Sequence, residues 1–185
     1  MKKFIYLVFF VILLIITLIA TYKISKNAPK TAPKLEEGQS DISFFRTNIT
    51  IPEFSFNDIF SNDQIFSKKD LEGKYSLINF FASWCTTCHA EHDILLSLSE
   101  EKIINIYGIA WRDVDENARQ YLEENANPFT KVVSDGNGLF TKLAGIEAVP
   151  ETWLIDKKGD AIMRFRGNLQ EFNIKEIKEF LSKNK

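Results

Sequence analysis

Near the middle of the chain, residues 79–89 read Asn79-Phe80-Phe81-Ala82-Ser83-Trp84-Cys85-Thr86-Thr87-Cys88-His89. An apolar run enters this stretch, and the apolar residues after it recur at helical spacing, so a buried strand is predicted to lead directly into a helix. Both cysteines of the protein lie at this junction, spaced C-x-x-C. The same letters spell C-x-x-C-H, the attachment motif of c-type haem. A redox-active dithiol and a covalent haem site are therefore the two interpretations to compare.

The dithiol interpretation assigns a different role to each cysteine. Disulfide exchange needs a thiolate, and a helix N-terminus favours negative charge through its unpaired backbone N–H groups and its dipole. Cys85 is therefore predicted to be the attacking nucleophile, partly exposed at the start of the helix. Cys88, one turn further along, is placed to attack the mixed disulfide and release the product. A purely structural cross-link is a weak alternative, because a disulfide over so short a loop restricts the unfolded chain very little.

The haem interpretation predicts a membrane-anchored c-type cytochrome, which needs a second axial ligand and a mostly helical wrap. His92 is too close in sequence to reach the opposite haem face, and we expect it at the surface. Met163 alternates with Ala161 and Phe165 on a predicted strand, so a core position is predicted for it. The long apolar strands also disfavour a cytochrome. Zinc is not expected, because two Cys and two His on one helix do not have the spacing of a tetrahedral site.

The N-terminus carries an uncharged, strongly apolar segment over residues 4–22. At about 1.5 Å per residue, such a helix approaches the roughly 30 Å hydrocarbon core of a bilayer. We predict an uncleaved transmembrane anchor over residues 4–22, with residues 1–3 cytoplasmic and residues 23–47 as a Lys- and Pro-containing linker. A cleaved signal peptide is the alternative, although Leu18 and Ala20 match its cleavage site poorly. Lysines flank the segment on both sides, so charge alone leaves the topology open.

Charge is distributed unevenly along the chain. Residues 1–40 carry six Lys and two Glu, and residues 41–185 carry 17 basic and 23 acidic side chains, a balance of −6. An acidic domain repels phosphate backbones, so nucleic acid is not expected as a partner. The 16 Phe supply ample material for a packed core without cysteine cross-links.

Residues 48–185 are predicted to form one α/β domain. Short extended pieces around Pro52 and a capped turn at 67–71 precede the first buried strand. The predicted elements that follow are a strand over 75–82, a helix over 85–101, a strand over 103–110, a helix with Val114, Ala118, Tyr121 and Leu122 on its apolar stripe, a short strand at 132–133, a helical turn at 139–143, a hairpin over 151–165 and an amphipathic helix with Phe172, Ile174, Ile177, Phe180 and Leu181. This order predicts a mixed sheet with helices on both faces.

A hydrophobic strand followed by Trp84-Cys85-Thr86-Thr87-Cys88 resembles the active site of the thioredoxin superfamily, which implies a thioredoxin-like three-layer sandwich. More narrowly, the chain resembles the membrane-anchored DsbE/CcmG-type thiol:disulfide interchange proteins of cytochrome c maturation. The matching segments, from about residue 50 to the end, are residues 79–85, Cys88-His89-Ala90-Glu91-His92, Asn127-Pro128-Phe129, residues 134–138, residues 149–156 and Phe165-Arg166-Gly167-Asn168-Leu169.

The resemblance implies site residues beyond the cysteines. Pro150 corresponds to the family's cis-proline beside the dithiol, which leaves the backbone of Val149 free to pair with an extended substrate peptide. Trp84, beside the dithiol, is expected to cover the site, with a simple packing role as the alternative. Glu91 and Glu151 match the acidic residues that flank the active site, where carboxylates disfavour the thiolate and can transfer protons. From the residues alone, Glu91 fits a solvent-facing helix position equally well, and Glu151 a charge at a strand edge.

Three residues near the dithiol affect the proton transfer, reduction potential and charge expected of this site. Asn79 stands where general thioredoxins have a buried Asp, as it does in the DsbE/CcmG branch, so proton transfer would fall to other groups. Thr86 replaces a usual Pro and leaves the reduction potential open. His89 replaces a common Arg or Lys and adds positive charge only when protonated.

By resemblance, we expect a protein-disulfide reductase with no cofactor beyond the Cys85–Cys88 disulfide and no metal. Its protein substrates would be the Cys pairs of apocytochrome c or of a maturation partner, and a membrane electron donor would re-reduce it. The expected location is the bacterial inner membrane, as a single-pass signal-anchor protein with its C-terminal domain in the periplasm. A general thiol oxidase or isomerase of the same fold is an alternative, because these activities share the same site.

Overall fold

The computed structural model describes residues 44–61 and 63–184. The predicted anchor over 4–22, the terminus over 1–3 and most of the linker over 23–47 lie outside these residues. Within the described part of the chain, no helix is both long and apolar enough to cross a membrane. The elements, in chain order, are β1 (Phe44–Thr50), β2 (Ser55–Asn57), β3 (Ile65–Ser67), the 3-10 helix η1 (Lys68–Leu71), β4 (Ser76–Phe81), α2 (Thr86–Ala90), α3 (His92–Glu100), β5 (Asn105–Trp111), α4 (Asp115–Asn125), β6 (Lys131–Asp135), α5 (Leu139–Ala144), β7 (Glu151–Ile155), β8 (Asp160–Arg166) and α6 (Glu171–Lys183).

The main sheet has six strands in the order β1-β8-β7-β4-β5-β6. Strands β4, β5 and β6 run parallel, whereas β7 lies antiparallel to β4 and to β8, and β1 lies antiparallel to β8. Strand β4 is central, and all six of its residues are buried, as its almost unbroken apolar sequence predicts for a strand covered on both faces. The predicted mixed α/β sheet is confirmed.

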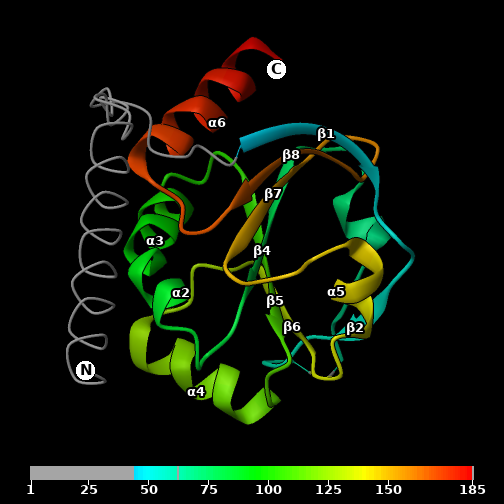
Figure 1. Cartoon of the computed structure of the whole chain (residues 1–185), viewed down its shortest axis with the longest axis vertical. Helices are drawn as coiled ribbons and strands as arrows, with labels where there is room; N and C mark the ends of the chain where they lie inside the picture. Colours follow the sequence, from blue (N-terminus) through cyan, green and yellow to red (C-terminus); the bar gives the residue numbers. More distant parts are fainter. Residues whose placement is uncertain (1–43, 62, 185) are drawn as a thin grey trace, which may run out of the picture. The chain divides into compact units, whose positions relative to one another are not determined.

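Helices cover both faces of this sheet (Figure 1). Because side chains alternate along a strand, β4 sends Leu77 and Phe81 into one core and Ile78 and Phe80 into the other. The first core contains the apolar sides of α3, α4 and α6, and the second contains α5, η1 and the separate β2–β3 hairpin. The dithiol follows β4 directly, so it lies at the carboxyl edge of the parallel strands.

Two predicted boundaries differ from the structure. Strand β1 begins at Phe44, before the predicted domain start at residue 48, because its backbone pairs with β8 from Phe44↔Phe165 onward. The helix predicted over 85–101 is interrupted: α2 ends at Ala90, and α3 begins at His92. Glu91, between them, turns its side chain into the core, as described below.

Two residues predicted on apolar stripes are exposed. Val114 precedes α4 as its N-cap and is 62% exposed, and Phe172, in the first turn of α6, is 42% exposed. The remaining stripe residues of α4, namely Ala118, Tyr121 and Leu122, are buried as predicted. Periodicity is least informative at a helix start, where the first residues project beyond the sheet that the helix covers.

Candidate active site

Cys85 is the N-cap of α2, with an extended backbone (φ −93°, ψ 104°). Its sulfur is joined to Cys88 in a disulfide whose Cα atoms lie 5.3 Å apart. The Cys88 backbone N–H donates to the Cys85 Sγ at 3.2 Å, and the Thr87 hydroxyl lies 3.3 Å from the same sulfur. When the disulfide is reduced, these two donors favour a thiolate on Cys85. The exposed fractions are 6% for Cys85 and 4% for Cys88, so Cys85 is more buried than predicted.

The loop before β7 lies against this disulfide. The Val149–Pro150 peptide bond is cis, and the Val149 carbonyl oxygen lies 3.8 Å from the Cys85 Sγ. Among the described residues, the Val149 N–H has no hydrogen-bond partner. The structure therefore brings Cys85, Val149 and Pro150 together and leaves a main-chain donor available close to the sulfur.

Trp84 is a large exposed side chain next to the disulfide, with 57% of its surface exposed. Its indole Nε1 donates to the carbonyl oxygen of Arg112, at 3.3 Å, and its ring centroid lies 6.1 Å from that of Trp111. Arg112 and Trp111 end β5 and begin the loop to α4, so this loop holds one side of the dithiol surface.

Asp113 fixes the turn that carries the dithiol. Its buried carboxylate accepts hydrogen bonds from the Ser83 N–H at 2.6 Å, the Ser83 hydroxyl at 3.0 Å and the Val114 N–H at 2.9 Å. Asp113 is not among the site residues predicted from the sequence. Its position just after a predicted strand was a usable signal, because the carboxyl ends of parallel strands meet at one edge of a sheet.

Glu91 is fully buried beneath the dithiol helix. Its carboxylate accepts hydrogen bonds from the Asn79 amide at 2.8 Å and from the Leu169 N–H at 2.6 Å. Burial raises the pKa of Glu91 to about 7, although the bonds from Leu169 and Asn79 act in the opposite direction. Glu91 is both the C-cap of α2 and the N-cap of α3, so these hydrogen bonds lie at the point where the helix is interrupted. The solvent-facing alternative for Glu91 is wrong.

Asn79 extends the network around Glu91 across the sheet. Its amide also donates to the Thr152 hydroxyl at 2.8 Å, on the neighbouring strand β7. Its own carbonyl oxygen Oδ1 is buried, and no described residue bonds to it. A carboxyl group that titrates near neutral pH thus sits in a polar network that sequence periodicity does not reveal.

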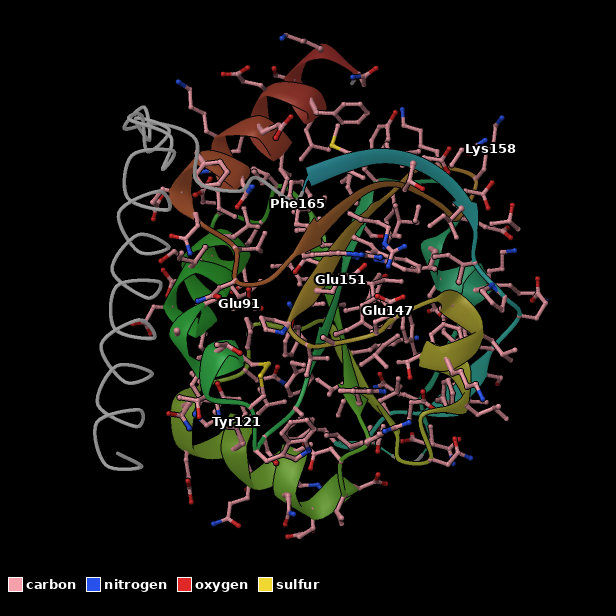
Figure 2. All side chains as sticks on the ribbon, in the orientation of Figure 1. Glu91, Tyr121, Glu147, Glu151, Lys158 and Phe165 are labelled. Atoms are coloured by element: carbon pink, nitrogen blue, oxygen red, sulfur yellow. A yellow bond between two sulfur atoms is a disulfide. The ribbon has the colours of Figure 1, made fainter. Side chains whose placement is uncertain are left out.

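Glu151 lies on the other face of the sheet from Glu91. Its Oε1 accepts hydrogen bonds from the Trp153 indole and from Arg164 Nε, each at 2.5 Å, and Arg166 Nε lies 3.7 Å from Oε2. Figure 2 shows Glu91 beside α2 and α3 and Glu151 on β7 in the sheet. The structure does not bring the two predicted acidic residues together, because Glu151 shares its face of β7 with Trp153.

The two histidines contact the same aromatic ring. His89 Nε2 donates to the Ser83 carbonyl at 2.7 Å, and its ring stacks on Tyr121 with centroids 4.5 Å apart. His92 was predicted at the surface but is only 6% exposed. Its Nε2 lies 3.0 Å from the carbonyl oxygens of both Asn125 and Ala126, where α4 ends. These bonds explain its burial.

The alternative of a covalent haem site is not favoured by this arrangement. Met163, the other candidate axial ligand, is 2% exposed in the core, as predicted. The two cysteines are bonded to each other in a mixed-sheet domain rather than in a helical wrap. In residues 44–61 and 63–184, no group of three or more His, Cys, Asp or Glu side chains is arranged to hold a metal ion.

A mixed sheet flanked by helices, with a C-x-x-C disulfide at a helix start and a cis-proline opposite it, defines the class of thioredoxin-like dithiol proteins. The Redoxin family model matches residues 46–181. The DsbE thiol:disulfide interchange protein of Vibrio cholerae is 33% identical over 127 residues, which cover 69% of this chain and 68% of that protein. The DsbE protein of Tatumella citrea is 31% identical over 170 residues, which cover 91% and 88%.

A solved structure agrees in fold. The thioredoxin-family thiol:disulfide interchange protein of Chlorobium tepidum superposes with a TM-score of 0.61 at 21% identity, over 74% of this chain and 98% of that one. This chain therefore belongs to the redoxin family and, within it, to the DsbE-type thiol:disulfide interchange proteins.

Proposed function

We propose that this thiol:disulfide interchange protein works as a reductant, and that its substrate is the disulfide of a C-x-x-C-H segment in apocytochrome c or of a maturation partner that holds those cysteines. The observation that carries the proposal is the Cys85–Cys88 disulfide at the start of α2, with the unpaired Val149 N–H beside it. This arrangement suits a protein substrate, because an extended peptide can pair with the Val149 backbone while its sulfur meets Cys85.

The proposed reaction transfers two electrons in two exchange steps. The Cys85 thiolate attacks one sulfur of the substrate disulfide, that S–S bond breaks, and one substrate thiolate leaves and is protonated. The Cys88 thiolate then attacks the Cys85 sulfur of the mixed disulfide, releasing the second substrate thiolate and forming the Cys85–Cys88 disulfide. Glu91 is the proposed group that takes up a proton as Cys88 ionises, because its carboxyl titrates near neutral pH.

The oxidised protein must be re-reduced before the next turn. We propose a membrane electron donor for this step, acting on the periplasmic side of the bacterial inner membrane. The N-terminal segment over residues 4–22 supports this location as a single-pass anchor, with residues 1–3 in the cytoplasm. A reporter-enzyme fusion at the C-terminus tests the topology, since a reporter that is active only in the periplasm should be active in it.

The substrate is tested by trapping. In the full chain, Cys88→Ser should accumulate a mixed disulfide with an oxidised peptide that carries C-x-x-C-H, because Cys85 attacks but nothing resolves the adduct. Cys85→Ser, the matched control, should form none. A Cys85→Ser variant that still reduced the peptide would overturn the assignment of the nucleophile. A Cys88→Ser variant that trapped no peptide would overturn the proposed substrate.

A further inference from the structure

We propose that Arg112 is a docking residue that binds an acidic side chain of the disulfide-bearing polypeptide, next to the disulfide that Cys85 attacks. This inference rests on the proposed function and adds a substrate preference to it. Arg112 begins the loop between β5 and α4, at the carboxyl edge of the sheet, where binding sites form in α/β folds. Its carbonyl accepts the Trp84 indole N–H at 3.3 Å, so it adjoins the residue immediately before Cys85.

The exposed Arg112 side chain already packs against the protein in the absence of a partner. Its guanidinium carbon lies 5.0 Å from the centre of the Trp111 ring, within the range of a cation–π contact. On another side it meets the backbone of Gly138, where an added Cβ would come within 2.8 Å of Arg112 Nε and 3.3 Å of Trp111 Nε1. A guanidinium that already packs on a ring loses less entropy on binding a carboxylate than a free one, and its planar fork suits that group.

The backbone of Arg112 supports the same inference. Its φ of 48° lies in the left-handed region, which non-glycine residues adopt at a cost and which is frequent at functional sites. The loop holds this conformation through the Arg112 N–H, which donates to the Asp135 carbonyl at 3.1 Å. Glycine would relieve the strain but would remove the guanidinium.

The charge of Arg112 has no carboxylate partner in the described chain. No described carboxylate lies within ion-pair distance of its guanidinium. The buried carboxylates of the adjoining loops are occupied elsewhere: Asp113 accepts from Ser83 and Val114, and Asp135 accepts from the backbone N–H groups of Phe140 and Thr141 and from the Thr141 hydroxyl. The site therefore offers an exposed positive charge that no described carboxylate neutralises and that complements an acidic side chain.

The surroundings of Arg112 suit an extended peptide. Trp84, before Cys85, Val114, at the N-cap of α4, and Leu139, the first residue of α5, are 57%, 62% and 56% exposed, so apolar side chains are available on the elements that adjoin the Arg112 loop. Residues 41–185 carry a net charge of −6, which repels an acidic chain in general. Attraction by Arg112 therefore acts at short range and selects which segment of a partner is aligned with Cys85.

The test compares two oxidised peptides that differ only by Glu or Gln beside the cysteine pair. Their second-order reduction rates by the reduced full-length protein are measured by stopped-flow fluorescence. The wild-type protein should favour the Glu peptide about threefold at low ionic strength, and the preference should vanish at about 1 M salt. Arg112→Gln should bring the ratio of the two rates to about one, Arg112→Glu should invert it, and Arg112→Lys should keep part of it.

Lys183→Glu, which changes charge by the same amount on the exposed end of α6, is the control and should keep the wild-type ratio. A ratio of one in the wild-type protein, or an unchanged ratio in Arg112→Glu, would overturn the docking role. Reduction of neither peptide and of no small neutral disulfide, such as bis(2-hydroxyethyl) disulfide, would overturn the proposed function instead. Thermal unfolding of each variant shows whether its fold is intact.

Discussion

Glu91 and Glu151 lie on opposite faces of the β4–β7 strand pair. Asn79 of β4 is opposite Thr152 of β7 and bonds to both Thr152 and Glu91, whereas Phe80 is opposite Glu151. A shift of one residue along a strand changes the face, so the two carboxylates enter different environments. Glu91 is buried among neutral donors, and Glu151 is paired with arginine. The two residues should therefore respond differently to substitution.

Glu91 should make the folded protein less stable as pH rises from about 4.5 to about 7. Its folded-state pKa is raised, so the folded state holds a proton that the unfolded state has lost in this window, and its contribution to stability disappears as that proton leaves. A shift of this size corresponds to about 3 kcal/mol over the window. Denaturant unfolding at several pH values should show this slope in the wild-type protein and a much smaller one in Glu91→Gln.

The control for Glu91 is Asp93→Asn, in the first turn of α3, where the side chain is exposed and the slope should stay as in the wild-type protein. Equal slopes in the wild-type protein and in Glu91→Gln would show that residue 91 is charged throughout this pH range. Such a result would also remove it as the proton acceptor during reduction.

Glu151 should matter for stability. Glu151→Gln removes the charge that pairs with Arg164, whose side chain is 12% exposed, and should lower the free energy of unfolding by roughly 3 kcal/mol. Glu147→Gln is the matched control, because Glu147 is exposed and lies 4.0 Å from Arg166, and it should cost under about 0.5 kcal/mol. If Glu151→Gln left stability unchanged but shifted the pH dependence of Cys85 alkylation, Glu151 would act on the dithiol rather than on the fold.

Asp113 should hold the dithiol turn in position. Asp113→Ala leaves the Ser83 and Val114 N–H groups without their carboxylate, which should cost about 2 kcal/mol or more of stability. The specific readout is hydrogen exchange at the Ser83 amide. Its rate should rise by more than the loss in the global free energy of unfolding accounts for. Asp115→Ala, at an exposed carboxylate in the first turn of α4, should leave that amide protected. Equal protection of Ser83 in both variants would contradict the positioning role.

The predictions from sequence succeeded for features that a local sequence pattern or motif indicates. The apolar run before Cys85 predicted the central strand, and the order of runs predicted the mixed sheet with helices on both faces. The C-x-x-C spacing predicted the disulfide, and the family resemblance predicted the cis bond at Pro150. The central strand and the C-x-x-C motif are each defined by residues that are neighbours in the chain.

The predictions failed where a side chain finds its partner far along the chain. Glu91, where the predicted helix is interrupted, is buried and bonds to Leu169, and the buried His92 contacts carbonyl groups at the end of α4. Glu151 pairs with Arg164 across the hairpin. Helical and strand periodicities place a residue on a face, but they carry no information about a hydrogen-bond partner tens of residues away.

The central claim, that Cys85 and Cys88 form a reducing dithiol, is tested most directly by the reduction potential of the purified protein in equilibrium with a reference thiol–disulfide couple. The oxidised fraction can be followed by thiol alkylation and mass spectrometry. We predict a potential well below about −200 mV, in the range of reducing dithiol proteins. A value near about −120 mV, typical of a strong protein oxidant, would contradict the claim.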